Sequence, residues 1–177
     1  LLDNEKFTLS ALARVREEYL DSSESIELEG IFDRDETIEV GLGFGYNTKL
    51  GNFNITYYQD IEGNHEGYEA SIGWKKPFRL TSNWKFEPYA KVNFRSDDLN
   101  NYYFGVSELE ANANRSIYTA GSTTDFQVGI SGKYKITNHQ MLILDASYST
   151  LGDEIKDSPI VDGSSSSGIK AIYIYRF

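Results

Sequence analysis

The chain has no cysteine and no long apolar run, and both absences narrow its class. Without cysteine there is no disulfide framework and no thiolate metal site. A membrane-spanning helix needs about 18 or more consecutive apolar residues, and no segment approaches that length. The low mean hydropathy of -0.47 still allows a membrane protein, because a spanning strand needs only ~9–11 residues with every second one apolar.

Acidic residues also outnumber basic residues. The 17 Lys and Arg residues stand against 27 Asp and Glu residues, which gives a net charge of -10. A nucleic-acid-binding protein needs a basic stripe or patch, so this balance argues against nucleic acid as a partner.

The last ten residues, 168–177, alternate apolar and mostly polar side chains and end on an aromatic residue. One face of such a strand carries Ile169, Ala171, Tyr173, Tyr175 and Phe177, and the other carries Lys170 and Arg176. This pattern is typical of the closing strand of an outer-membrane β-barrel. It predicts outer-membrane lipid around the barrel and recognition of Phe177 by the barrel-insertion machinery of a Gram-negative bacterium.

The same alternation recurs along the chain. It predicts eight strands at about 5–17, 36–49, 52–60, 66–78, 84–95, 124–136, 140–150 and 168–177. The fold class is therefore all-β, a transmembrane antiparallel up-and-down barrel in a single domain over residues 1–177. A soluble sandwich or lipocalin-like barrel also alternates, but turns its apolar face inward.

Loop lengths favour the membrane alternative. Short turns at 50–51, 79–83 and 137–139 fall at one end, and long polar connections at 19–35, 97–123 and 152–167 fall at the other. Outer-membrane barrels have short periplasmic turns and longer extracellular loops. The connection at 61–65 is the exception, because it is short yet belongs to the extracellular end.

Two stretches resemble a known family. The run Tyr102, Tyr103, Phe104, Gly105, Val106, Ser107 resembles the Tyr-Phe/Tyr-Gly-Val-Ser signature of the MipA/OmpV family of outer-membrane proteins. The later run Asp157, Ser158, Pro159 and the closing Tyr-Arg-Phe are similar to the C-terminal end of that family.

The resemblance implies a location and a role. Members are longer at the N-terminus, so the chain is expected to lack several N-terminal strands and the signal peptide. Members are described as outer-membrane scaffolds that link a lytic transglycosylase to a peptidoglycan synthase, and others as porin-like or adhesive surface proteins. The family carries no known catalytic residues and no cofactor.

The strand faces opposite the lipid carry a mixed set of charges. These lumen-facing residues are Arg14, Arg16, Glu39, Glu69, Lys75, Lys85, Glu87, Lys91, Arg95, Lys133, Lys135, Asp145, Lys170 and Arg176. As a conduit, this wall would mildly prefer anions. As a filled interior, it would pair opposite charges across neighbouring strands, and the mixed signs favour pairing.

Two loop segments each have a functional and a structural interpretation. An acidic run (Glu17, Glu18, Asp21, Glu24, Glu27, Glu29, Asp33, Asp35, Glu36) lacks the spacing of a calcium loop and is interpreted as a solvated loop. Tyr102, Tyr103 and Phe104 form either an exposed binding patch or, as we favour, a plug at the barrel mouth.

The two histidines, His65 and His139, are expected at opposite ends of the barrel, and no serine is placed to use His65 as a base. We therefore expect no enzymatic activity and no metal site.

Overall fold

The computed structural model describes residues 2–18 and 28–176, which form one antiparallel sheet with two short helices. The long strands are β2 (Phe7–Arg16), β3 (Thr37–Thr48), β4 (Gly51–Asp60), β5 (Tyr68–Lys75), β7 (Trp84–Arg95), β8 (Thr123–Lys135), β9 (Gln140–Thr150) and β10 (Ser165–Tyr175). The remaining elements are β1 (Leu2–Asp3), β6 (Phe78–Arg79), α1 (Asp97–Phe104) and α2 (Asp153–Lys156). Each of the eight expected strands is confirmed.

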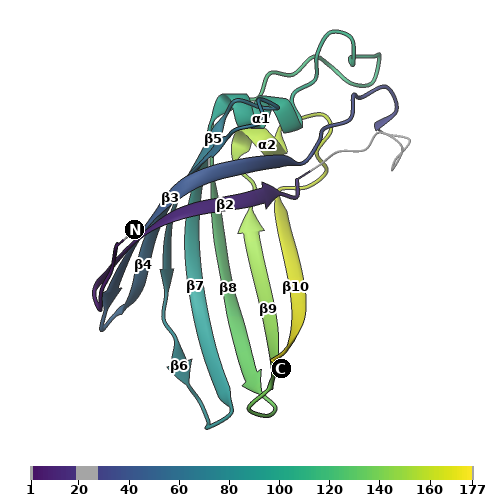
Figure 1. Cartoon of the computed structure of the whole chain (residues 1–177). Coiled ribbons are helices and arrows are strands. Elements are labelled where there is room, and N and C mark those ends of the chain that lie inside the picture. Colours follow the sequence, from purple (N-terminus) through teal and green to yellow (C-terminus); the bar gives the residue numbers. More distant parts are fainter. Residues whose placement is uncertain (1, 19–27, 177) are drawn as a thin grey trace.

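The sheet is a meander in which each long strand pairs with the next one along the chain. β1 extends the edge beside β2, and β6 continues the hairpin by pairing with β7. Figure 1 shows the strands as one curved wall. Among the described residues β2 and β10 do not pair with each other, so this barrel-like sheet is open where a closed barrel was expected.

The two ends of the sheet differ as the loop lengths predicted. The end that carries the connections 49–50, 76–83 and 136–139 is called the turn end below, and the opposite end is called the loop end. Figure 1 shows both helices at the loop end. None of the helices in the described part of the chain is long and apolar enough to cross a membrane.

The outer face of the strands is apolar. In β3 the alternate residues Ile38, Val40, Leu42, Phe44 and Tyr46 are all exposed, as the period-two pattern requires of a lipid-facing side. Stacked aromatic pairs lie near the turn end, where Trp84 contacts both Phe86 and Tyr134. The Tyr57 and Tyr68 rings stack near the loop end. These positions match the two aromatic belts of a membrane barrel.

Among the described residues, the buried apolar side chains lie in the helices and loops that connect the strands rather than inside the sheet. They are Ile31, Leu99, Tyr103, Val106, Ala120 and Ile155. We call this group the loop core. A soluble sandwich would instead bury the apolar face of its strands, so the burial pattern agrees with the membrane barrel.

The helix α1 begins with favourable local interactions. The Ser96 hydroxyl accepts a hydrogen bond from the Leu99 amide at 3.3 Å, and Asp97 and Asp98 occupy the first turn, where the helix dipole favours negative charge. The helix ends before Gly105, whose amide donates to Asn101.

The facing of β7 yields the first prediction. Val92 is exposed on the apolar side, opposite Ile72 and Phe126 in neighbouring strands, and Lys91 faces the inner side. Val92→Arg should destabilise the protein in lipid vesicles by roughly 2–4 kcal/mol, because it places a charge at mid-membrane depth. Lys91→Gln should have a small effect. Urea unfolding in vesicles measures both, and a larger loss for Lys91→Gln would show that the facing is inverted.

Candidate functional site: the charged inner wall

Contacts between strands that are not neighbours identify the inner face of the sheet. Arg14 and Arg16 on β2 both reach Glu69 on β5, with Nη–Oε distances of 3.1 and 3.0 Å. Because β3 and β4 lie between these strands, such contacts are possible only on the concave side of a curved sheet. The charged residues of this side form two groups with different pairing.

The first group lies toward the loop end and is almost fully paired. We call it the upper cluster: Arg14, Arg16, Glu18, Glu39, Glu69, Arg95 and Asp125. The fully buried Glu39 accepts hydrogen bonds from Nε of Arg14 at 2.5 Å and Nε of Arg16 at 2.9 Å. Arg95 bridges Glu18 and Asp125, with both N–O distances 2.9 Å.

The neighbouring aromatic and lysine side chains complete the upper cluster. The Arg14 guanidinium stacks on Tyr58 at 3.9 Å from the ring centre. Lys91 Nζ lies 3.8 Å from Glu69. Burial opposes ionisation of Glu18, but Arg95 and Arg16 outweigh it and hold the pKa of Glu18 below its usual range.

His65 forms the top of this cluster. Its side chain is fully buried, and its Nδ1 accepts a hydrogen bond from the Gly67 amide at 3.0 Å. The other ring nitrogen, Nε2, lies 3.3 Å from Glu39. The short connection containing His65 is held by the Asp60 carboxylate, which accepts hydrogen bonds from the backbone amides of Glu62, Gly63, His65 and Glu66.

This arrangement gives His65 a structural role. In the described part of the chain no serine hydroxyl contacts either of its ring nitrogens. His139 lies in the β8–β9 turn, at the other end of the sheet. The two histidines are therefore in separate environments, and within residues 2–18 and 28–176 neither has the partners of a hydrolase triad.

The family-like loop residues come together above the upper cluster. The rings of Tyr102 and Tyr103 lie 6.1 and 6.0 Å from the His65 ring, and the buried Tyr103 hydroxyl donates to the Asp35 carbonyl. Ser158 is also buried, and its hydroxyl donates to the Phe104 carbonyl at 2.6 Å. The two stretches are thus one packed unit, although Asp157, Pro159 and Ser107 remain exposed.

Glu110 links this unit to the first long connection. Its carboxylate accepts hydrogen bonds from the Phe32 amide, the Ser107 amide and hydroxyl, and Arg34. Burial alone would raise the pKa of Glu110, but these donors lower it to about 2.

The second group of charges lies toward the turn end and is poorly paired. Glu87 is the carboxylate closest to it, with Oε1 at 4.0 Å from Lys75 and 3.7 Å from Lys133. Lys85 and Lys135 are exposed, and no carboxylate of the described residues lies within ion-pair distance of either. Lys170 is opposite Asp145 in the β9–β10 register, and Asp145 accepts a hydrogen bond from Tyr89 at 3.0 Å.

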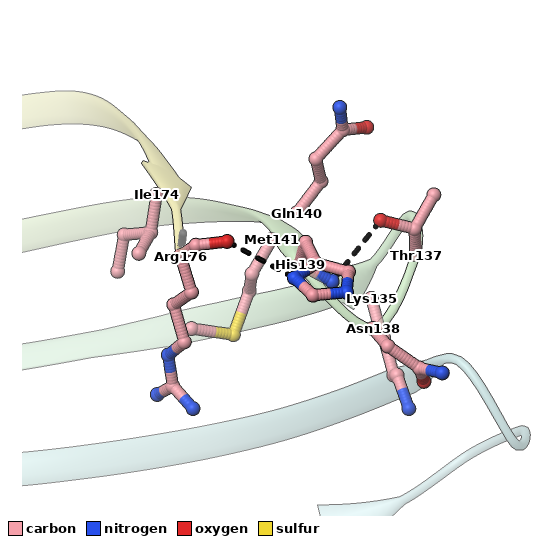
Figure 2. Close-up of a pocket in the computed structure, with 8 residues that line it drawn as sticks. All are labelled: Lys135, Thr137, Asn138, His139, Gln140, Met141, Ile174 and Arg176. Atoms are coloured by element: carbon pink, nitrogen blue, oxygen red, sulfur yellow. Dashed lines mark hydrogen bonds between the residues drawn. The ribbon is translucent and has the colours of Figure 1, made fainter.

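Arg176 belongs to this turn-end group. Its amide donates to the His139 carbonyl at 2.8 Å, and its own carbonyl lies 3.1 Å from His139 Nδ1. A hollow of about 220 Å³ lies at this turn. Figure 2 shows the side chains that line it, with Lys135 and Arg176 extending to the same side and Gln140 to the opposite side.

Sequence reasoning missed several members of the wall. Alternation along a strand cannot identify Glu18 and His65, because both lie outside the strands. Arg79 belongs to β6, within the segment 79–83 that the sequence predicts to be a turn. Asp125 could have been predicted to face inward, because it is two residues before Gln127 in β8 and alternate residues share one face of a strand. Ser96 followed by two aspartates was a readable helix start for α1.

Two expectations concern residues outside the described ranges. Asp21, Glu24 and Glu27 of the acidic run and the terminal Phe177 cannot be placed in the structure. Among the residues that are described, no three His, Asp or Glu side chains are grouped for metal binding.

Comparison with known proteins adds the family. Residues 1–177 match the family described as MltA-interacting protein MipA. The chain belongs to the MipA family. It is 30% identical over 157 residues to outer membrane protein Omp26La of Vibrio anguillarum, with 89% of this chain and 60% of that protein covered. It is equally similar to outer membrane protein OmpV of Vibrio cholerae, with the same coverage.

A third relative is the MltA-interacting protein of Escherichia coli, 29% identical over 147 residues, with 82% of this chain and 58% of that protein covered. This MipA-family chain therefore spans about 60% of the length of the curated relatives it matches. No solved structure matches it. The family and the relatives identify it as an outer-membrane protein of a Gram-negative bacterium.

The upper cluster generates the second prediction. Glu39→Gln leaves the buried Arg16 and the half-buried Arg14 with one carboxylate fewer. Removing one partner of a buried ion pair costs about 3–5 kcal/mol. The matched control is Glu36→Gln, because Glu36 is exposed just before the same strand. Urea unfolding in lipid vesicles, followed by tryptophan fluorescence, should show a large loss for the first variant and a negligible one for the second. Equal midpoints would contradict a stabilising role for the cluster.

Proposed function

We propose that this MipA-family protein is a non-conducting, non-enzymatic scaffold of the outer membrane that recruits peptidoglycan-remodelling enzymes on its periplasmic side. The partner class follows from the relative named MltA-interacting protein, since MltA is the lytic transglycosylase implied by the family resemblance. The same proposal includes binding of a peptidoglycan synthase by the scaffold.

The observation that carries the proposal is the occupied loop end of the inner wall. The upper cluster joins β2, β3, β5, β7 and β8 through side-chain contacts, and Tyr102 and Tyr103 of α1 lie above it at His65. A barrel whose interior is filled by paired side chains serves as a rigid support rather than as a conduit.

The turn end is the surface such a support would offer to partners. Outer-membrane barrels place their short turns in the periplasm, where peptidoglycan enzymes work. The β8–β9 turn is braced against the end of β10 by the hydrogen bonds between His139 and Arg176. A braced turn presents a fixed surface, which lowers the entropic cost of docking.

The third prediction tests this sidedness. An affinity tag of about eight residues inserted between Asn138 and His139 should abolish capture of an MltA-type lytic transglycosylase from a detergent extract of outer membranes. The same insertion between Asp162 and Gly163, at the loop end, should leave capture unchanged, because exposed loops tolerate insertions. Heat-modifiable migration on gels verifies that both variants are folded. Equal capture by both folded variants would remove the turn end as the docking surface.

A small-solute channel is the second candidate, and the poorly paired basic residues near the turn end favour it. The fourth prediction separates it from the scaffold. In planar bilayers the folded protein should give little or no steady conductance, because the upper cluster and α1 occupy the bore. Stable anion-selective steps that weaken in the Lys91→Gln/Lys133→Gln variant would establish a pore instead.

A further inference from the structure

The turn end of the inner wall has a row of cations that the carboxylates of the described residues neutralise only in part. In the sheet register Arg79 of β6 is directly opposite Lys85 of β7, and Lys85 is directly opposite Lys133 of β8. We call these three residues the basic row. Adjacent strands are about 4.8 Å apart, so the row places three like charges within about 10 Å. Like charges directly opposite each other destabilise a sheet.

The same protein pairs its cations closely elsewhere. In the upper cluster, Arg14, Arg16 and Arg95 each have a carboxylate within 3.1 Å. Of the described carboxylates, Glu87 is the one within ion-pair distance of the basic row, at 3.7 Å from Lys133 and 4.0 Å from the neighbouring Lys75. No ion pair is formed by Arg79 or Lys85 within the described residues. The contrast within one wall points to a ligand that supplies the missing negative charge.

The simplest explanation of the basic row would be that its side chains bind the lipid headgroups around the barrel. The side of the sheet on which the row lies excludes this explanation. Lys85 lies between Trp84 and Phe86, whose rings stack on each other and on Tyr134 and Phe78 at the outer side. Residues alternate between the two faces of a strand, so Lys85 and its register partners face inward. The row is reached from the aqueous mouth at the turn end rather than from the bilayer.

The hollow in Figure 2 extends the basic surface along the same end. It is lined by Lys135 and Arg176, which are two further cations, together with the hydroxyl of Thr137 and the imidazole of His139. Lys135 follows Lys133 by two residues and thus shares its face. Its backbone amide donates to the Asn83 carbonyl, which ties the β8–β9 turn to the start of β7 beside Lys85.

We propose that the turn-end mouth of the inner wall is a binding site for a multiply charged oxyanion, with carboxylate or phosphate groups, that enters from the periplasmic side. Lysine ammonium groups and the Arg79 guanidinium contact the anion and remove the repulsion along the row. The upper cluster lies on the far side of this site, where the arginines are already paired with carboxylates. This proposal concerns a small ligand and does not depend on recruitment of an enzyme.

The fifth prediction uses the full chain, folded in neutral detergent, and two soluble probes, a tetraglutamate peptide and inorganic tripolyphosphate. At least one should bind, and its affinity should fall steeply as salt rises, because the Debye length shrinks to about 10 Å at 0.1 M. Lys85→Gln/Lys133→Gln should weaken binding at least tenfold. The charge-conserving Lys85→Arg/Lys133→Arg variant should restore it.

The matched control is Lys49→Gln/Lys76→Gln, which removes the same charge from exposed positions of the turn end outside the row and should change affinity less than twofold. Tighter binding of tetraglutamate assigns carboxylates, and tighter binding of tripolyphosphate assigns phosphates. Competition by short-chain phosphatidylglycerol, but not by phosphatidylcholine, assigns a lipid headgroup as the source of the phosphate. No binding of either probe, or equal binding by the Lys85→Gln/Lys133→Gln variant and the unmodified chain, overturns the proposal, whatever the result of enzyme capture.

Discussion

The ion pairs of Glu39 and Glu69 with Arg14 and Arg16 hold the curvature on which the rest of the wall depends. The Glu39 pairs join β2 to its neighbour β3. The Glu69 pairs connect β2 to β5 across two intervening strands, which a flat sheet would keep too far apart. Buried charges are expensive to desolvate and are retained where each has partners. Glu39 meets this condition with two guanidinium groups and the Nε2 atom of His65.

The loop unit is built on the same contacts. Glu39 orients His65, the rings of Tyr102 and Tyr103 lie near that imidazole, and the loop core continues from Tyr103 to Leu99 and Val106. The ion pairs thus contact His65, His65 contacts the aromatic rings, and the rings belong to the apolar loop core. These contacts explain why the family-like residues are found in this loop. They place a small apolar core beside the loop end of a polar inner wall.

The inner wall thus has two halves with different consequences. Paired charges near the loop end give rigidity, and among the described residues the poorly paired cations near the turn end leave a favourable potential for anions. Membership of the MipA family and the names of the relatives place the protein in the outer membrane. The proposed scaffold role would use the turn end, where the basic residues lie, at the periplasmic surface.

The sequence by itself determined the strands, their facing and the two unlike ends. Each of these follows from period-two alternation, from loop length and from the need to present apolar side chains to lipid. It could not determine which cations are neutralised, because Arg16 and Glu69 are 53 residues apart and meet only through the curvature of the sheet. Nor did the Tyr102–Phe104 stretch indicate a helix, since its packing depends on Ser158 and Asp35 from distant loops. The alternation of side chains and the loop lengths depend on residues close together in the sequence, so they can be predicted from it. Charge pairing and the open sheet edges depend on contacts between distant residues, which only the tertiary structure creates.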